Sequence, residues 1–322
     1  MTKKGIVILC FAWMLAACSE RIVPVEEYGQ LSVKDSRLVD AQGNTMSLKG
    51  VAFGWHNYWP RFYNATAVKT LAEDWGCTVV RASIGVEPRD GYIDKPEVAM
   101  QCLYNVVDAA IANGVYVIVD WHTHHIKLEE SKKFFTDVAT KYKDYPNIIY
   151  EIYNEPVDDT WEAVKAYSEE MIRTIRAIDP NQIILVGCPH WDQDIHIVAD
   201  DPITGYDNLI YTFHFYAGTH NEELRERGVY AISRGLPLFI SECAGTEATG
   251  DGPIAEEEWD NWMKWIRDND LSWCAWSIAD KNETSAMLTP EATDGGPWSR
   301  GAVKEWGRII KKELGREDEI NR

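Results

Sequence analysis

Two glutamates, Glu155 and Glu242, are the residues with which this sequence could do chemistry, because each ends an apolar segment. The segment 148–153 reads IIYEIY and leads into the tripeptide Asn-Glu-Pro that contains Glu155, while the segment 237–241 reads PLFIS and leads into Glu242. Such runs are typical of buried strands, and a proline directly after a strand ends its pairing. In α/β barrels, functional groups gather at the C-terminal ends of the strands. Two carboxylates placed there are the pair that glycosidic bond hydrolysis requires.

The elements that must position these glutamates repeat as a strand followed by a helix. Strands are expected at 49–53, 77–83, 115–122, 147–153, 182–187, 208–214, 237–242 and 271–276, and helices at 65–75, 96–113, 128–142, 160–178, 193–199, 221–234, 255–269 and 301–314. Continuously apolar strands indicate a parallel sheet buried on both faces. Eight such units within about 270 residues predict an α/β fold of the (β/α)8 TIM barrel type. A doubly wound open sheet is the alternative, but the first strand–helix turn has no glycine-rich phosphate loop.

The first 18 residues have the features of an export signal rather than of the fold. Lys3 and Lys4 precede an apolar run, 5–17, that is too short to span a membrane and ends in Leu-Ala-Ala before Cys18. This pattern resembles the bacterial lipobox, in which the cysteine is lipidated; an ordinary signal peptide with a chance cysteine is the alternative. We therefore expect lipidation at Cys18 and a cell-envelope lipoprotein, in the outer membrane or at the cell surface of a Gram-negative bacterium. Its contact with the membrane would be this anchor alone.

The remainder of the chain is expected to form a tether and one domain. Residues 19–29 are the tether, and residues 30–322 are a single (β/α)8 catalytic domain. At the start of the domain, residues 30–48 alternate between apolar and polar side chains around a Gly-Asn pair at 43–44. This pattern predicts a short N-terminal β-hairpin, which could plug the bottom of the barrel.

Charge and composition narrow the partners of the chain. The 322 residues carry a formal net charge of −19, which excludes nucleic acid as a partner because phosphate would be repelled. The acidity favours a neutral substrate over an anionic one. The 14 Trp and 15 Tyr fill core positions and also suit the apolar faces of pyranose rings. The five cysteines that follow Cys18 have no metal-ligand spacing and are odd in number, so we expect buried free thiols: Cys77, Cys102, Cys188, Cys243 and Cys274.

In a (β/α)8 barrel, polar residues at the C-terminal ends of the strands converge on one site. Those ends supply residue types that are useful in sugar chemistry: Arg81, His122, Asn154, Glu155, His214, Tyr216, Glu242 and Trp276. Each has an ordinary structural explanation by itself, such as a surface ion pair for Arg81 or a core position for Trp276. Their convergence therefore carries the prediction.

With their neighbours, these residues resemble glycoside hydrolase family 5, and in particular its bacterial endo-β-1,4-glucanases. The resemblance covers residues 30–314 and rests on VVRAS around Arg81, DWH before residue 123, YEIYNEP at 150–156, FHFYAGTH at 213–220, ISE at 240–242 and WSIADKNETS at 276–285. Clan relatives with other substrates share the Asn-Glu-Pro tripeptide, so the spread of motifs over seven strand ends is the specific feature.

The resemblance implies retaining hydrolysis of a β-glucan polysaccharide or oligosaccharide by double displacement, with no cofactor. Glu155 would be the general acid/base, with a pKa raised by the neighbouring carboxylate and a partly dry cleft, and Glu242 would be the nucleophile. Arg81 and Tyr216 would keep Glu242 ionised. The resemblance implies that Asn154 binds the sugar 2-hydroxyl, that His122 and His214 line the subsite, and that Trp276 is a platform under the reacting sugar. Lys281 and Glu283 would bind hydroxyls of more distant sugars. We expect the chain to act as a monomer.

The loop after the first strand departs from the glucanase pattern. It reads FGWHNYWP at 53–60, with the histidine shifted by about two places and the aromatic residues doubled. Tyr58 or Trp59 could supply the platform for a distal sugar, and Trp191 on a later loop is another candidate. These loops leave the preferred β-glycan open.

Three other interpretations remain. The run DWHTHH at 120–125 suggests a metal-dependent hydrolase on the same fold, although we predict no metal site. A glycan-binding lipoprotein without catalysis is possible in principle, but such proteins usually lose a catalytic carboxylate. Another clan relative, a β-mannanase or a mixed-linkage β-glucanase, is the strongest rival, because loops decide the substrate.

Overall fold

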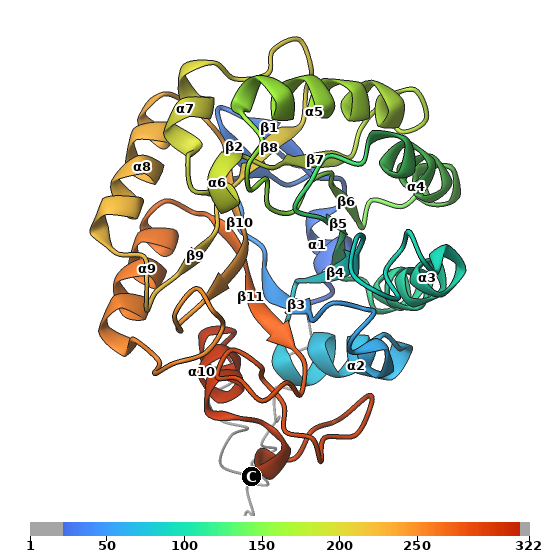
Figure 1. Ribbon diagram of the computed structural model, residues 1–322, viewed down its shortest axis with the longest axis vertical. Helices are drawn as coiled ribbons and strands as arrows, with labels where there is room; N and C mark the ends of the chain where they lie inside the picture. Colours follow the sequence, from blue (N-terminus) through green and yellow to red (C-terminus); the bar gives the residue numbers. More distant parts are fainter. Residues whose placement is uncertain (1–21, 316–322) are drawn as a thin grey trace, which may run out of the picture.

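The computed structural model describes residues 22–315, so the predicted export signal and Cys18 lie outside the described residues. Eight parallel strands close into a barrel inside a ring of helices (Figure 1), which confirms the predicted TIM barrel. In barrel order the strands are β3 (Lys49–Phe53), β4 (Val79–Gly85), β5 (Tyr116–His122), β6 (Ile148–Glu151), β7 (Ile183–Val186), β8 (Leu209–Thr212), β10 (Leu238–Ala244) and β11 (Ser272–Ile278). β11 pairs with both β10 and β3, which closes the ring. The short β9 (Phe215–Tyr216) pairs with the end of β10.

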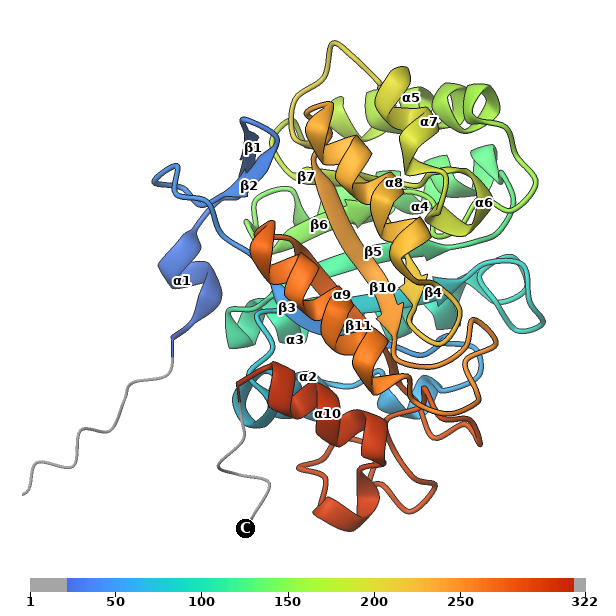
Figure 2. The same ribbon diagram turned by 90° about the vertical axis from the view of Figure 1, so that its left-hand side faces the viewer.

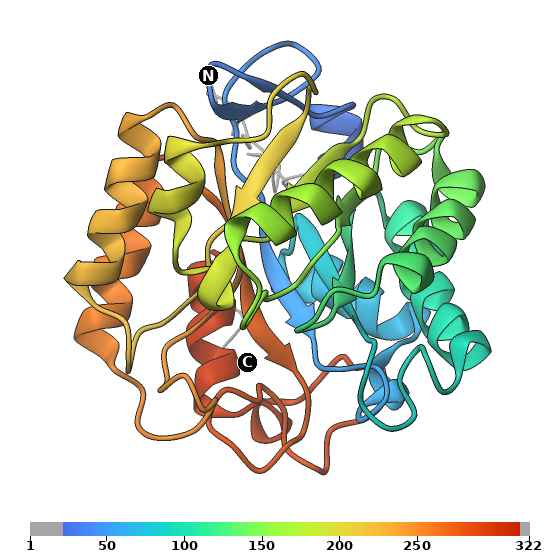
Figure 3. The same ribbon diagram turned by 45° about the horizontal axis from the view of Figure 1, so that its top comes forward.

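The helices lie close to the ranges that the sequence pattern predicts. They are α2 (Ala65–Thr70) with η2 (Leu71–Trp75), α3 (Pro96–Asn113), α4 (Leu128–Tyr142), α5 (Trp161–Arg176), α7 (Ile195–Asp200), α8 (Glu222–Ser233), α9 (Glu256–Asp268) and α10 (Glu305–Glu313). Side chains cap the first turns of α2 and α8: Asn64 accepts a hydrogen bond from the amide of Ala67 at 3.0 Å, and Asn221 accepts one from the amide of Glu223 at 3.1 Å. Figure 3 shows α8 and α9 (orange) on the opposite side of the barrel from α3 and α4 (cyan to green).

A hairpin covers the end of the barrel at which the strands begin (Figure 2). It consists of β1 (Ser32–Lys34) and β2 (Arg37–Val39), which pair antiparallel. Leu31 and Leu38 join the apolar cluster inside the barrel with strand residues such as Ile118 and Ile210. The plug is therefore confirmed. The tight turn between β1 and β2 is Asp35–Ser36, with φ of 49° and 62°. The predicted Gly-Asn pair lies in a second turn after β2, where Val39 forms an antiparallel bridge with Thr45.

Part of the segment predicted as a tether is folded onto this hairpin. Residues Pro24–Tyr28 form helix α1, and Pro24 is buried. The amide of Val25 donates to the carbonyl of Gly114 at 2.9 Å, and the carbonyl of Tyr28 accepts from Ala41 at 2.8 Å. Val25 and Tyr28 also pack against the inner cluster. These apolar contacts explain why this stretch is helical and attached rather than extended.

The opposite end of the barrel carries the polar residues. β6 ends at Glu151, two residues before the predicted boundary, so Asn154 and Glu155 stand on the loop that follows. That loop is held by its backbone: the amide of Asn154 donates to Trp121 at 3.2 Å, and that of Glu155 donates to Thr123 at 3.2 Å. The loop therefore presents Glu155 from a fixed frame.

The five cysteines after Cys18 are free and buried, as expected. Within residues 22–315, no helix has the length and apolar character needed to cross a bilayer.

Candidate active site

A groove crosses the C-terminal ends of the strands, and the predicted site residues line it or lie beneath it. One half, here called the Glu242 half, is lined by Trp55, Tyr58, Trp59, His122, Glu242, Gly250, Trp276, Ser277, Lys281 and Glu283. The other half, the Trp191 half, is lined by His190, Trp191, Gln193, His214 and His220. Both halves share His124, Glu155, Tyr216, Ala248 and Thr249. The groove is therefore continuous, with Glu155 where its halves meet, and this shape suits an extended chain.

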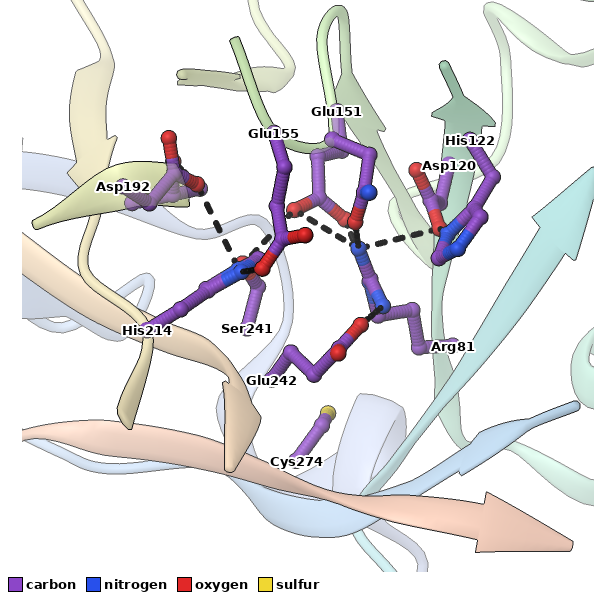
Figure 4. A network of polar contacts seen from close by, with 12 residues as sticks. Arg81, Asp120, His122, Glu151, Glu155, Asp192, His214, Ser241, Glu242 and Cys274 are labelled. Carbon is purple, nitrogen blue, oxygen red and sulfur yellow. Dashed lines mark hydrogen bonds and ion pairs between the residues drawn. The ribbon is translucent and has the colours of Figure 1, made fainter. Parts of the chain in front are cut away.

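Arg81, fully buried on β4, organises the floor of the groove (Figure 4). Its Nε donates to Glu151 at 2.6 Å and its Nη1 to Glu242 at 2.8 Å. Its Nη2 donates to the Oδ1 of Asn154 at 2.6 Å and lies 3.0 Å from Asp120. Burial by itself would lower the pKa of Arg81, but the three carboxylates raise it well above its ordinary value. Arg81 thus stays charged and fixes Glu242 and Asn154 together.

The two carboxylates that are buried with Arg81 resist full ionisation. Burial raises the pKa of Asp120 to about 6 and also raises the pKa of Glu151, although Arg81 opposes both effects. Three carboxylates around one guanidinium would otherwise carry excess negative charge in a dry site.

Glu242 is held by two donors. Its Oε1 accepts a hydrogen bond from the hydroxyl of Tyr216 at 2.6 Å, and its Oε2 accepts from Arg81 at 2.8 Å. Burial and then Glu242 itself raise the pKa of Tyr216 well above its ordinary value, so the phenol keeps its proton and donates it. Donors on both oxygens fix the orientation of this carboxylate.

Glu155 has a different environment, made of imidazoles. His214 Nδ1 lies 3.0 Å from Oε1, and His124 Nε2 lies 3.5 Å from Oε2. Burial raises the pKa of Glu155, but the contacts with His124 and His214 outweigh burial and hold the pKa below its ordinary value. The raised pKa expected from the sequence is therefore wrong, because that expectation counted the neighbouring carboxylate and not the two imidazoles.

The separation of Glu155 and Glu242 is informative. One carboxylate oxygen of each, together with a ring nitrogen of His214, lie within 4.8 Å of one another. Glycosidases that retain anomeric configuration hold their carboxyl groups about 5–5.5 Å apart, whereas inverting enzymes need roughly 6.5–9.5 Å to admit a water. An oxygen from each glutamate within 4.8 Å of the other is closer to the retaining separation than to the inverting one.

The histidines of the run at 120–125 do not share a ligand set. His122 Nδ1 lies 2.7 Å from Asp120, whereas His124 points at Glu155. Burial and then Arg81 lower the pKa of His122 to about 3, so its imidazole is neutral and donates from Nδ1 to Asp120. The ring of Trp276 stacks on His122 with centroids 5.4 Å apart and an interplanar angle of 11°. His122 and Trp276 therefore form a wall of the Glu242 half.

The remaining predicted residues lie along the groove. Lys281 forms an ion pair with Glu283 in the Glu242 half. Tyr58 is 55% exposed there, whereas Trp59 packs against the core, so Tyr58 is the better placed of the two for a distal sugar. Trp191, 40% exposed, lines the other half.

Sequence reasoning missed five residues that build the site: Trp55, Asp120, His124, Glu151 and Asp192. Asp120 and Glu151 carried a signal, because each is a charged residue inside an apolar strand segment. Trp55 packs edge-on against His122 with centroids 4.3 Å apart. Asp192 lies under the groove beside His214, and nothing in its local sequence marks it.

The profile of the family described as Cellulase (glycosyl hydrolase family 5) matches residues 39–282. The chain belongs to glycosyl hydrolase family 5. The chain is 40% identical over 280 residues to Endoglucanase A of Evansella cellulosilytica, and the match covers 84% of this chain and 57% of the relative. It is 37% identical over 317 residues to Endoglucanase N of Pectobacterium atrosepticum, which covers 96% of this chain and 71% of the relative.

Solved structures agree with this family 5 assignment. A structure from Cytophaga hutchinsonii superimposes with a TM-score of 0.88 at 41% identity, covering 90% of this chain and 96% of the other. The catalytic domain of an endoglucanase from Thermobifida fusca superimposes with a TM-score of 0.86 at 30% identity, and the match covers 91% of this chain and 99% of that domain. The chain covers 99% of that catalytic domain but only 57% of the length of Endoglucanase A.

Proposed function

We propose that this family 5 chain is a retaining endo-β-1,4-glucanase that hydrolyses cellulose-type β-glucans. The observation that carries the proposal is the pair Glu155 and Glu242, whose oxygens lie within 4.8 Å in the middle of a continuous groove. Relatives over most of the chain are named endoglucanases. A glutamate-to-glutamine variant of the Thermobifida endoglucanase has been solved in complex with cellotetraose.

In the first step, a carboxylate oxygen of Glu242 attacks the anomeric carbon while Glu155 protonates the leaving oxygen. Arg81 and Tyr216 hold Glu242 ionised and oriented, so the charge required for attack is in place before sugar binds. The product of this step is a covalent glycosyl-enzyme, and the sugar bearing the new hydroxyl leaves through the Trp191 half.

In the second step, Glu155 acts as a base and removes a proton from water, which attacks the same carbon and releases Glu242. Asn154 supports both steps, because its Nδ2 is buried without a protein partner while its Oδ1 is held by Arg81. A sugar 2-hydroxyl would satisfy that Nδ2, and this contact strengthens in the transition state.

The groove supports binding of a neutral polysaccharide. Trp276, Tyr58 and Trp191 offer flat faces along it, and Lys281 and Glu283 offer donors and acceptors for hydroxyls. We propose that the chain acts as a monomer on this substrate and needs no cofactor.

The test is a product profile on carboxymethylcellulose, barley β-glucan and mannan, measured with the Glu242→Ala variant as the blank. We expect a rapid fall in the viscosity of carboxymethylcellulose and a mixture of short β-1,4-oligosaccharides. Preferred cleavage of mannan would assign the chain to the β-mannanases, and cleavage confined to barley β-glucan would assign it to the mixed-linkage β-glucanases. Either result would overturn the proposed substrate without changing the mechanism.

We also propose that residues 1–18 direct export and that Cys18 is lipidated, which makes the protein a cell-envelope lipoprotein. The support is the Leu-Ala-Ala-Cys sequence after a short apolar run. Membrane fractionation of the wild type and of Cys18→Ser tests this. The wild type should sediment with outer membranes, and the variant should lose lipid labelling; equal labelling of both would contradict it.

A further inference from the structure

Asp192 takes no part in the two steps of hydrolysis, yet it is fully buried beside the groove. Its Oδ2 lies 3.4 Å from Nε2 of His214 (Figure 4). Its Oδ1 accepts a hydrogen bond from the amide of Cys188 at 2.6 Å, and its Oδ2 accepts one from the hydroxyl of Thr212. Burial raises the pKa of Asp192 well above its ordinary value, and His214, Thr212 and the amide of Cys188 act against burial by stabilising the ionised carboxylate.

The backbone that delivers Asp192 is strained. The segment α6 (Pro189–Asp192) contains three consecutive non-glycine residues in the left-handed region, with φ of 60° at His190, 54° at Trp191 and 58° at Asp192. A side chain with a Cβ is disfavoured there, so the surroundings must hold this turn in place. The turn exposes Trp191 to the groove and directs Asp192 to the buried side of His214.

His214 consequently lies between two carboxylates. Its Nδ1 is 3.0 Å from Glu155, and its Nε2 is 3.4 Å from Asp192 and 2.8 Å from the hydroxyl of Ser241. With both carboxylates ionised, Nδ1 can donate to Glu155, and Nε2 can donate to the hydroxyl of Ser241 beside Asp192. An imidazole with a proton on each nitrogen is the charged form.

We propose that Asp192 is a positioning residue that holds His214 charged, with its Nδ1–H aimed at Glu155, so that His214 stores the proton that Glu155 delivers. This inference rests on the hydrolysis proposed above. It resolves a conflict in the site, because a glutamate flanked by two imidazoles is ionised at rest and yet must protonate the leaving oxygen.

The proton balance of the cycle is complete. As sugar displaces water from the groove, the Nδ1–H bond of His214 breaks and an O–H bond forms on Glu155. In the first step that O–H bond breaks and the proton bonds to the leaving oxygen. In the second step Glu155 takes a proton from the attacking water, and that proton returns to Nδ1 of His214. One water is consumed per bond cleaved, and no other reactant is needed.

The charges around His214 support this arrangement from each element packed against it. They are Asp192 on the turn, Glu155 after β6, Glu151 at 4.0 Å on β6, Glu242 on β10, and His124 across Glu155. Burial lowers the pKa of His214, but Asp192 and then Glu155 outweigh burial and raise it to about 9.

The first test is NMR titration of the His214 imidazole in the wild type, in Asp192→Asn and in Asp179→Asn, with His214→Asn for assignment. Asp179, in the loop between α5 and β7, is the matched control, because it is also buried and accepts hydrogen bonds from the hydroxyl of Tyr150 and the amide of Gln182. We expect Asp192→Asn to lower the titration midpoint of His214 by about one pH unit or more and Asp179→Asn to leave it unchanged. An unmoved midpoint in Asp192→Asn overturns the proposal, whatever the enzyme cleaves.

The second test is kinetic and separates positioning from a merely structural role. Cellotetraose needs a protonated leaving oxygen, whereas an aryl β-cellobioside with an acidic phenol does not. In Asp192→Asn, we expect the basic limb of kcat/KM for cellotetraose to move about one pH unit lower, with an about 10- to 100-fold loss above it. The activated aryl substrate should lose less than about threefold. Equal losses on both substrates with an unmoved basic limb would show a structural role and overturn the proposal.

A milder variant guards against misfolding of Asp192→Asn. Thr212→Val removes the hydroxyl that orients Asp192 and keeps the aspartate. It should lower the His214 midpoint in the same direction by a smaller amount, and no change in either variant would contradict the role of Asp192. A wild type that cleaves neither substrate would instead refute the proposed function, while the NMR titration would still decide whether Asp192 governs His214.

Discussion

Glu242 and Glu155 are the same residue type less than 5 Å apart, and the barrel gives them opposite surroundings. Glu242 is held by Arg81 and Tyr216, two groups that keep their protons throughout the working pH range. Glu155 is held by His124 and His214, two imidazoles that can take up and release a proton, with the pKa of His124 raised and that of His214 raised to about 9. A nucleophile requires a constant charge and an acid/base requires a mobile proton, so the contrast in neighbours matches the contrast in roles.

The supporting layers differ in the same way. Beneath Glu242, Arg81 binds carboxylates that come from regular strands, β5 and β6, whose positions follow from barrel geometry. Behind Glu155, His214 is backed by Asp192 from a strained turn outside any strand. The surroundings of the nucleophile are thus built from the regular strands of the barrel, whereas the surroundings of the acid/base depend on one loop. Loops change more readily than strands, so pH response should be easier to alter than nucleophilicity.

The largest expected effect comes from removing each glutamate in turn. Glu242→Ala should reduce kcat for cello-oligosaccharides by roughly 10⁵-fold, and Glu155→Ala should do the same on poor leaving groups. Azide distinguishes them, because it enters the vacated position: it should give the α-glycosyl azide with Glu242→Ala and the β-glycosyl azide with Glu155→Ala on activated aryl cellobiosides. NMR of the products reads the anomer. The same anomer from both variants would end the assignment of roles.

Arg81→Lys tests the surroundings of the nucleophile Glu242. Lysine keeps a charge but cannot reach Glu151, Asn154 and Glu242 together, so the loss falls on both orientation and stability. We expect kcat to fall by about 10²-fold or more and the free energy of unfolding to fall by about 3–5 kcal/mol. Arg61→Lys, which alters half-exposed pairs with Asp280 and Asp294, is the control and should cost less than about 1 kcal/mol in chemical denaturation. Comparable losses of stability in both variants would show that the contacts of Arg81 with Glu151, Asn154 and Glu242 contribute no more than surface ion pairs.

The titration of His214 beside Glu155 should make the free energy of unfolding depend on pH. Because the pKa of His214 is raised from 6.5 to about 9, its contribution is fully present below pH 6.5 and is lost as the pH rises through 9. Asp120, raised from 3.8 to about 6, acts at lower pH and does not overlap this window. Denaturation curves should therefore show a loss on the order of 3 kcal/mol between pH 6.5 and 9 in the wild type. His214→Asn should flatten that slope and His125→Asn should not; a persistent slope in His214→Asn would place the titration elsewhere.

Sequence patterns predicted the parts of this molecule that periodicity and strand ends determine. The eight strands, the plug and the groove position of Glu155 and Glu242 follow from apolar runs with a polar end, because a parallel barrel brings all those ends together. Asp192 could not be predicted in this way, since it stands in a left-handed turn that no propensity of Pro-His-Trp-Asp favours. The pKa of Glu155 was mispredicted for the same reason: it depends on His124 and His214, which are distant in sequence or outside the regular strand. Local sequence propensity predicts helices and strands, whereas the pKa of a buried group depends on tertiary contacts.

The smallest expected effects separate the two halves of the groove. Trp55 packs on His122 in the Glu242 half, whereas Trp191 stands on the turn in the other half. Losing one aromatic face should cost about 0.5–1.5 kcal/mol, or roughly 2- to 10-fold in affinity. Trp55→Ala should raise KM for cellotetraose and leave the partition of the glycosyl-enzyme between water and an added cellobiose acceptor unchanged. Trp191→Ala should lower transfer to that acceptor, because the acceptor binds on the side from which the leaving sugar departs. Product chromatography with and without cellobiose measures both effects, and equal effects of the two variants on transfer would show that the halves do not divide donor from acceptor.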